Sequence, residues 1–277
     1  MSILLCLLIA NAGVSSLLMP ASPAGVITAF SASSGGEAVF YNPAHLVAGD
    51  DFRLTCYYNH LYVGMKSISL ALCRRFNDRD FGLSITNFDY GDIEQHPYYP
   101  SDDSMAYYSA NDFSLGISGS TRVSSKGRVG LTVRYIAENI YVYGDQTLAF
   151  DGALAYEGTG FNFGFGATNI GYKLTINNED VNLPAKLSAG GSVNVKKAVA
   201  CFDVHYLINS GSFEFGHAWR IPVVPVMECR VGINYRQRFY PGFGVVVTAG
   251  TFTVEYGAAL YPYNLGLVNT VGVGLSF

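Results

Sequence analysis

The chain has 277 residues, of which 14% are charged, and its formal net charge is -4 with a pI near 5.7. A typical soluble domain carries roughly 25% charged residues and a nucleic-acid-binding domain is normally basic, so the composition argues against both classes. Aromatic residues also reach 14%, with 20 Tyr and 18 Phe, and 31 residues are Gly. This mixture is typical of β-structure whose outer surface meets an apolar solvent.

The first twelve residues predict an export signal. Residues 2–10 form a short apolar core, and the Ala-Asn-Ala sequence at 10–12 matches an A-x-A cleavage site that leaves Gly13 as the first mature residue. The usual basic residues before such a core are missing, because no Lys or Arg precedes Arg53. A misplaced start, a weak signal with later cleavage, and a buried first strand are the alternatives.

Residues 13–51 are rich in Ala, Ser, Gly and Pro and are too weakly patterned to form a membrane strand. The glycine pair at 35–36 and the motif Asn42-Pro43-Ala44 supply turns that let a chain double back in a small space. Strand side chains can fill a barrel of about eight strands, whereas about 16 strands leave a water channel. We therefore expect this segment to fill the lumen of a fourteen-strand barrel as a periplasmic plug or hatch. A disordered periplasmic arm is the alternative.

From Phe52 onward the sequence predicts a transmembrane antiparallel β-barrel of about fourteen strands. Most segments are close to the roughly 9–11 residues that cross a bilayer at a tilt, and an even number puts both ends on one side. The predicted strands are Phe52–Asn59, Met65–Arg74, Phe81–Tyr90, Asp112–Ser120, Val129–Tyr141, Leu148–Glu157, Phe161–Ile170, Ala185–Val195, Ala198–Leu207, Ser212–Arg220, Met227–Arg236, Phe243–Ala249, Thr251–Tyr261 and Leu265–Phe277.

The last strand shows which face meets lipid. Its apolar residues fall on one parity, broken only by Asn269, and the other parity is nearly all small or weakly polar, which is the period of a strand. The apolar set is Leu265, Leu267, Val271, Val273, Leu275 and Phe277. Such a sparse polar parity suits a crowded lumen, so we expect the apolar parity to face lipid. The strand needs a partner, and pairing with Phe52–Asn59 would close the sheet.

The connections alternate between short and long. With the C-terminal end taken as periplasmic, every second connection is a short turn, and Ile221–Val226 is the bulkiest of this class. The opposite class contains the two longest connections, Gly91–Asn111 and Gly171–Pro184. Tyrosines near strand ends predict aromatic girdles at the two membrane interfaces, namely Tyr57, Tyr58, Tyr62, Tyr90, Tyr135, Tyr141, Tyr143, Tyr256, Tyr261 and Tyr263.

Charged side chains of both signs recur on the inward parity. We expect them to form cross-barrel networks that anchor the plug, with ion selectivity as the alternative. Arg134 and Asp151 lie on adjacent predicted strands, as do Glu214 and Arg230. The full set is Arg53, Arg134, Glu138, Asp151, Glu157, Asp203, Glu214, Glu228, Arg230, Arg236 and Glu255, with His205 beside Asp203.

No catalytic, cofactor or metal site is predicted. Asp203 and His205 share one strand face with Cβ atoms roughly 6.5 Å apart, but no nucleophile accompanies them. The remaining His residues are scattered, and four cysteines sit singly on predicted strands without metal-like spacing. Packed thiols are expected there, and a disulfide is the alternative.

One stretch carries a family resemblance. Residues 35–46, GGEAVFYNPAHL, resemble the (D/E)A-x-x-x-(Y/W)NPAGL segment of two related groups, the FadL-type hydrophobic-compound transporters and the PorV/PorQ outer-membrane proteins, with His45 in place of the usual Gly. Further stretches are similar to the PorV/PorQ pattern, at 87–94, 108–112, 133–140, 169–184 and 265–277. The resemblance implies a FadL-like barrel in the bacterial outer membrane with an N-terminal plug, and an assembly-signal role for Phe277.

The resemblance implies two non-enzymatic functions. The first is an adaptor or shuttle in protein export, as in type IX secretion, whose partners are secretion-system proteins or exported cargo. Its candidate docking loop is acidic and rich in Tyr, which offers contact area at low entropic cost, and a solvated lid is the alternative. The loop residues are Asp92, Glu94, Tyr98, Tyr99, Tyr107 and Tyr108.

The second function is passive transport of a hydrophobic small molecule, with Phe88, Leu148 and the plug lining the route. The sequence favours the adaptor, because the outer loops are short for building a deep apolar pocket. Apart from the lipid of the membrane, we expect protein partners or a hydrophobic ligand and no nucleic acid.

Overall fold

The computed structural model describes residues 14–33, 35–46, 52–95 and 106–277. The predicted signal at 1–12 lies outside the described residues, and so do Tyr98 and Tyr99 of the predicted docking loop.

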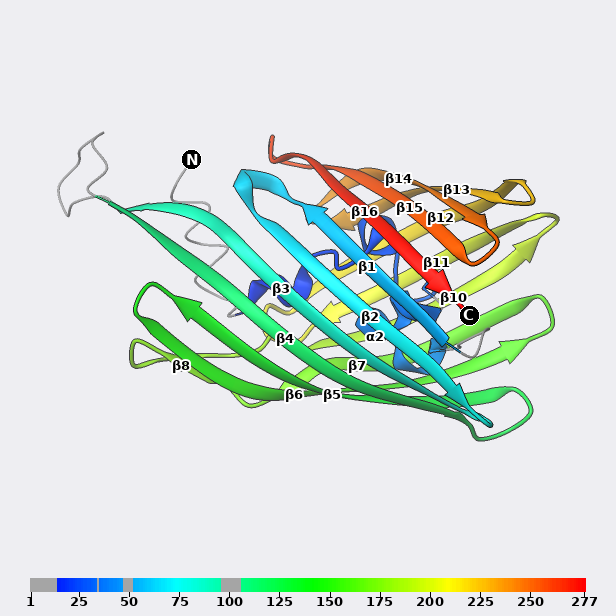
Figure 1. The fold of residues 1–277 in the computed structure, drawn as a ribbon, viewed down its shortest axis with the longest axis horizontal. Helices are drawn as coiled ribbons and strands as arrows, with labels where there is room; N and C mark the ends of the chain where they lie inside the picture. Colours follow the sequence, from blue (N-terminus) through cyan, green and yellow to red (C-terminus); the bar gives the residue numbers. More distant parts are fainter. Residues whose placement is uncertain (1–13, 34, 47–51, 96–105) are drawn as a thin grey trace.

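Within the described residues, fourteen antiparallel strands close into a barrel (Figure 1), as the sequence predicts. Each strand pairs with its neighbour in the chain, except that β7 pairs with β10. The barrel strands are β1 (Phe52–His60), β2 (Lys66–Phe76), β3 (Arg79–Gln95), β4 (Ala106–Arg122), β5 (Gly127–Ile140), β6 (Tyr143–Gly158), β7 (Phe161–Gly171), β10 (Lys186–Val195), β11 (Ala198–Leu207), β12 (Ser212–Val224), β13 (Met227–Arg236), β14 (Arg238–Ala249), β15 (Phe252–Tyr261) and β16 (Gly266–Ser276).

The barrel closes between its first and last strands. β1 and β16 pair from Arg53 opposite Ser276 to His60 opposite Asn269. Beyond β16, the Phe277 N–H donates to the Phe52 carbonyl at 3.0 Å, and the Phe52 N–H donates back at 3.2 Å. The predicted seam is therefore correct, and it leaves no open sheet edge in the barrel.

The outward face of the barrel is apolar. In β16, Leu267, Val271 and Val273 are 43–49% exposed, whereas the inward Val268 and Thr270 have no exposed surface. The same alternation recurs around the wall, and bulky aliphatic and aromatic side chains point outward. An apolar outer belt over a polar interior is the arrangement of a transmembrane barrel. None of the helices in the described part of the chain is long and apolar enough to cross a membrane.

Two predicted connections are shorter than the sequence suggested. β3 continues to Gln95 and β4 already begins at Ala106, so both strands extend into the predicted loop 91–111 and project as a hairpin. The register of the two strands shifts between Asp89 and Asp92. Cross-strand pairs such as Ile93 with Tyr108 extend the ladder.

β12 is likewise longer than predicted and runs to Val224. The register between β12 and β13 shifts between Pro222 and Val224, which accommodates Pro222 because proline has no N–H for a regular ladder.

The predicted loop 171–184 also has structure of its own. It contains a two-stranded hairpin of β8 (Leu174–Ile176) and β9 (Glu179–Val181), whose turn residues Asn177 and Asn178 both have positive φ. Leu174 is fully buried in a cluster with Val14, Ile136, Ala149 and Leu183. This hairpin therefore packs against the barrel wall.

The described residues 14–33 and 35–46, here called the N-terminal segment, lie inside the barrel (Figure 1). Val26 and Ile27 pack with the inward-facing Phe88 and Val268 in one apolar cluster. The segment forms only short turns of helix, since its Gly and Pro content disfavours longer ones. These are η1 (Ser15–Leu18), η2 (Pro23–Val26), η3 (Gly35–Glu37), α2 (Ala38–Tyr41) and η4 (Pro43–His45), and a further 3-10 turn, η5 (Tyr62–Gly64), joins β1 to β2.

The predicted aromatic girdles are only partly correct. Tyr58, Tyr141, Tyr143 and Tyr263 are well exposed, but Tyr57 is only 1% exposed. Tyr62, Tyr240 and Tyr261 also point inward and pack against the apolar cluster of Val26 and Ile27. The Tyr261 ring lies 5.7 Å from that of Tyr62 and 4.7 Å from that of Tyr240. Position near a strand end did not distinguish a lipid-facing Tyr from one that covers the lumen.

Candidate functional site

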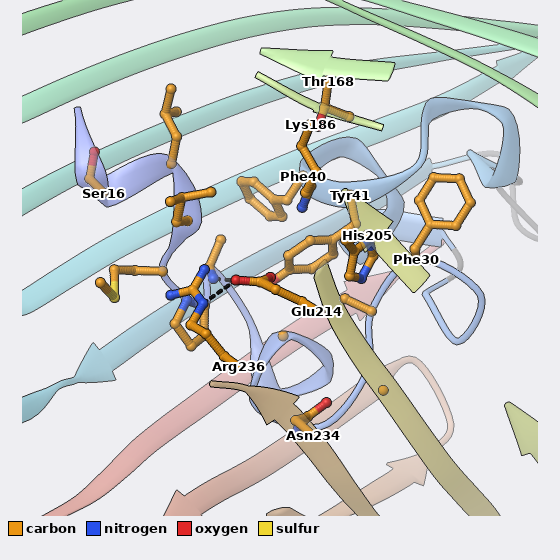
Figure 2. A pocket seen from close by; sticks show the side chains of 18 of the residues that line it. Ser16, Phe30, Phe40, Tyr41, Thr168, Lys186, His205, Glu214, Asn234 and Arg236 are labelled. Carbon is orange, nitrogen blue, oxygen red and sulfur yellow. Dashed lines mark hydrogen bonds and ion pairs between the residues drawn. The ribbon is translucent and has the colours of Figure 1, made fainter. Parts of the chain in front are cut away.

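A cavity of about 130 Å³ lies inside the barrel, between the N-terminal segment and the wall (Figure 2). It sits in the half of the barrel that carries the longer hairpins. Apolar side chains of the N-terminal segment form much of its lining, with Phe88 of β3. The contributing residues of the segment include Leu17, Leu18, Met19, Ile27, Phe30 and Phe40.

The opposite side of the cavity is polar and comes from adjacent strands. Glu214 of β12 forms an ion pair with Arg236 of β13, and these two residues lie directly opposite each other in the sheet. His205 of β11 is held by Ser188, whose Oγ lies 2.9 Å from the imidazole Nδ1. Lys186, the first residue of β10, reaches toward Phe40 and Tyr41 (Figure 2). It makes no close ion pair with any residue that the structure describes, although the Glu214 carboxylate acts on it electrostatically.

Tyr41 also lines this cavity. Its hydroxyl oxygen accepts from the N–H groups of Ala21 and Ser22 at 2.9 and 3.0 Å. Removal from water raises the pKa of Tyr41 to about 12. The hydroxyl therefore stays protonated at neutral pH and ties two turns of the segment together as a neutral group.

Asp203 binds the middle of the N-terminal segment to the wall. Its carboxylate accepts from the Phe30 N–H at 2.9 Å, from the Ser31 N–H at 3.0 Å and from the Thr28 hydroxyl. Hydrogen bonds to a charged acceptor are each worth about 1.5–3 kcal/mol when buried. Asp203 thus fixes the backbone beside the cavity.

Glu37 binds the segment at a second place. It accepts from Ser22 Oγ at 2.9 Å and the Ala24 N–H at 3.1 Å, and its other oxygen lies 3.4 Å from the Arg230 guanidinium. Arg230 also pairs with Glu228 at 2.9 Å and lies 3.9 Å from Glu255. The segment therefore supplies one carboxylate to a buried cluster whose other members come from β13 and β15.

Arg128 holds the end of the segment. Its guanidinium donates to the carbonyl oxygens of Ala44 and Leu46 at 3.2 and 3.3 Å and pairs with Asp80. The predicted turn motif lies at this point. Asn42 has no exposed surface, caps η4 by accepting from the Ala44 N–H at 3.1 Å, and donates to the Phe30 carbonyl at 3.1 Å.

The structure places the predicted polar residues in separate groups. Arg134 and Asp151 form a buried ion pair of 2.8 Å. Glu214 and Arg230 lie on adjacent strands as predicted, and the register places Arg236 opposite Glu214, with which it pairs. Asp203 and His205 bind different partners, so the predicted lumen residues Arg134, Asp151, Asp203, His205, Glu214, Arg230 and Glu255 do not form a single network.

Three other predicted positions have clear placements. Phe88 is 1% exposed and lines the cavity, but Leu148 is 43% exposed on the outer face and cannot line a route through the lumen. Asp92, Glu94, Tyr107 and Tyr108 lie on the projecting β3–β4 hairpin, where the Tyr107 hydroxyl donates to Glu94 at 3.3 Å. Phe277 is 68% exposed at the barrel seam.

Sequence reasoning missed Lys186, Arg128 and Glu37. Lys186 has the inward parity of Ser188 on the same strand, which would have placed it in the lumen. Arg128 has the inward parity of Arg134 but lies one residue before the predicted strand Val129–Tyr141. Glu37 carried no comparable signal, because its role depends on the path of the N-terminal segment. Within the described residues, no group of His, Cys, Asp and Glu side chains is arranged to hold a metal ion.

Comparison with known proteins gives a fold. No protein-family model and no curated protein sequence matches the chain. The Ralstonia pickettii toluene transporter TbuX superposes with a TM-score of 0.72 at 13% identity, covering 95% of this chain and 100% of that one. The P. putida toluene transporter TodX gives 0.69 at 12% identity, covering 94% and 99%.

A Pseudomonas aeruginosa FadL homologue gives a TM-score of 0.62 at 10% identity, covering 94% of this chain and 98% of that one. At such low identity the likeness concerns the fold. The chain therefore shares its closed β-barrel fold with these three structures.

Proposed function

We propose that this protein is a passive, non-enzymatic transporter of small hydrophobic molecules across the bacterial outer membrane. The lumen cavity carries the proposal. An apolar cavity of about 150 Å³ can hold one benzene molecule, so the cavity of about 130 Å³ suits a ligand of about one aromatic ring. The toluene transporters among the structures of the same fold support this size class.

The lining indicates a ligand with one polar end. Phe40, Phe88 and Ile27 offer apolar contact, while Lys186 brings an ammonium group that forms no close ion pair with a described residue. A monoaromatic anion such as benzoate would place its ring against the apolar side and its carboxylate on the Lys186 ammonium. A charged hydrogen bond of this kind contributes about 1.5–3 kcal/mol, which corresponds to roughly 10-fold to 150-fold in affinity.

The proposed route continues into a second cavity of about 300 Å³ in the half of the barrel with the short turns. Gly36 and Glu37 line this second cavity, whereas Phe40 and Tyr41 line the first. The short stretch 36–41 thus stands between the two. We infer that the N-terminal segment acts as a plug, and that passage requires this stretch to shift.

Ligand binding tests the proposal. Equilibrium dialysis of the purified protein against radiolabelled toluene and benzoate should show binding of both. Lys186→Met should weaken benzoate binding about tenfold or more by removing the charged contact, and should leave toluene binding unchanged. Lys173→Met is the matched control, since Lys173 is 54% exposed and pairs with Asp180 outside the lumen.

A cavity-filling variant locates the ligand. Leu18 lines the cavity without being fully buried, and Leu18→Trp should occupy the space and abolish binding of both compounds. If Leu18→Trp bound them as well as the native protein, the lumen cavity would not be the binding site. If neither compound bound the native protein, the proposed ligand class would be wrong.

Export and assembly complete the proposal. We propose that residues 1–12 direct export and that Phe277 serves as the assembly signal, in line with the family resemblance. Phe277 is well exposed at the end of the chain, where a recognition factor could reach it. Phe277→Ser should reduce the amount of folded barrel in the outer membrane, measured by heat-modifiable migration of the membrane fraction on gels.

The β3–β4 hairpin favours a second function, that of an adaptor in protein export. Its strands extend the ladder to Gln95, and exposed Tyr107 lies beside acidic Glu94 at its outer part. The resemblance to PorV and PorQ points the same way. A pull-down with the native chain should then recover secretion-system proteins. Deletion of residues 92–109 should abolish that recovery and leave ligand binding intact, and this result would favour the adaptor.

A further inference from the structure

A groove of about 580 Å³ runs along the outward face of the barrel over β7, β10 and β11. Phe161 and Phe163 of β7 stand on one side of it, and Phe202 and Val204 of β11 stand on the other. These four side chains are 40–55% exposed. The groove therefore lies on the apolar belt of the wall and is separate from the lumen.

The strand register explains why the groove exists. Gly191 lies directly between Phe163 on β7 and Phe202 on β11, and Ala189 lies directly between Phe165 and Val204. Both central residues face outward on a belt that is otherwise bulky. Their small size leaves a low floor between two rows of large apolar side chains.

The dimensions of the groove suit one hydrocarbon chain. Its floor runs along β10 from Ala189 to Val193, which is ~13 Å at the rise of a strand. One leaflet of a bilayer has a hydrocarbon layer of ~15 Å. An acyl chain lying along the strand would therefore fill the groove within a single leaflet.

Two cations stand at one end of this groove. β10 and β11, which form its floor and one wall, are joined by a turn of Lys196 and Lys197, both exposed. Neither lysine forms an ion pair with a residue in the described part of the chain. The neighbouring β6–β7 turn carries no charge, and the nearby carboxylate of Glu157 is already paired with Arg122 at 3.2 Å. An anionic group beyond the end of the groove would therefore meet uncompensated positive charge.

We propose that the groove and the lysine pair form a specific site for one anionic phospholipid of the leaflet that faces the short turns. The acyl chain lies over Ala189 and Gly191, and the phosphate contacts Lys196 and Lys197. Lysine is a common phosphate ligand, and basic residues at a membrane surface attract anionic lipids. The site is independent of the lumen and of the transport proposed above.

Native mass spectrometry of the full-length protein in detergent tests the site, with phosphatidylglycerol and phosphatidylcholine of identical acyl chains as probes. The native protein should retain one phosphatidylglycerol and should prefer it to phosphatidylcholine. The double variant Lys196→Gln/Lys197→Gln should weaken phosphatidylglycerol retention about 30-fold and remove the preference. Lys126→Gln, in the exposed turn between β4 and β5, is the control for general loss of charge.

A second variant tests the apolar half. Ala189→Phe should fill the groove and lower retention of both lipids, while heat-modifiable migration shows that the barrel still folds. The proposal is overturned if the lysine variant and Lys126→Gln retain phosphatidylglycerol equally, or if Ala189→Phe leaves retention unchanged. A dimer that excludes lipid from the native protein would assign the groove to a second copy and would also overturn it.

Discussion

Asp203 positions the N-terminal segment, because its carboxylate accepts hydrogen bonds from two backbone N–H groups and one hydroxyl of that segment. Asp203→Ala would leave the N–H groups of Phe30 and Ser31 buried without an acceptor, at about 1–3 kcal/mol each. We expect this variant to loosen the segment while the barrel persists. Limited chymotrypsin digestion in membranes should cleave faster at Phe30. Asp180→Ala, outside the lumen, is the control, and equal cleavage of both variants would contradict the role given to Asp203.

His45 should make the stability of the folded protein depend on pH. Burial lowers the pKa of His45 from 6.5, and nearby Arg128 lowers it further while Glu157 opposes the change. Below pH 6.5 the imidazole of His45 binds a proton in the unfolded chain but stays neutral in the folded chain. The contribution of His45 to the free energy of unfolding is therefore fully present above pH 6.5 and is lost as the pH falls toward the folded pKa. The free energy of unfolding should decrease by at most about 1.4 kcal/mol per pH unit in this window.

Urea unfolding in detergent micelles at pH 8 and pH 5.5 would measure the effect. His45→Gln should remove this part of the pH dependence, because glutamine does not titrate. A pH dependence that is identical in the variant and the native protein would assign it to other groups.

Contacts between individual side chains could be predicted from the sequence only where the order of the strands and the parity of the residues were enough to identify both partners. Arg134 and Asp151 could be matched because they share the inward parity on adjacent strands, and they do pair. Glu214 and Arg230 do lie on adjacent strands, but Glu214 pairs with Arg236, because the register of β12 and β13 decides the partner and parity alone does not. Lys186 was missed although the predicted strand Ala185–Val195 contained it on the inward parity of Ser188.

At the scale of elements, η4 approaches β5 so closely that only glycine fits between them. A Cβ atom on Gly130 would lie 2.2 Å from the carbonyl carbon of Pro43 and 2.4 Å from the Ala44 nitrogen. Gly130→Val should therefore displace η4 and break its contacts with Arg128, lowering the free energy of unfolding by about 1–3 kcal/mol.

Gly119→Val provides the matched comparison, since a Cβ on Gly119 meets no atom within 4 Å. Urea unfolding monitored by circular dichroism should show a lower midpoint for Gly130→Val and a nearly native midpoint for Gly119→Val. Equal midpoints would mean that η4 yields without loss of stability.

The strands were predictable because lipid on one side and a polar lumen on the other impose a period of two on each of them. The N-terminal segment has no such period. Its short turns exist through tertiary contacts, such as Ile27 against the small residues of β13 and β14, and propensity alone does not reveal them. The extra length of β3 and β4 was missed because the hairpin leaves the membrane, where the apolar alternation ends.

At the scale of the whole molecule, the N-terminal segment and the wall form one packed interior. A fourteen-strand barrel is too wide for its own side chains to fill. The native protein should therefore show little steady current in a planar bilayer, whereas a variant lacking residues 14–46 should conduct. A large, steady current from the native protein would contradict a plugged lumen, and so would a deletion variant that folds but does not conduct.

The seam has a consequence for the kinetics of folding. Arg53 Nε donates to Ser276 Oγ at 3.1 Å across 223 residues of chain. A contact at such sequence separation forms slowly, because nearly the whole loop must be ordered before it closes. Until then β1 and β16 each present unpaired backbone groups that can template pairing with another chain. We therefore expect closure to come late in assembly, and any delay in it lengthens the time for which the chain is prone to aggregate.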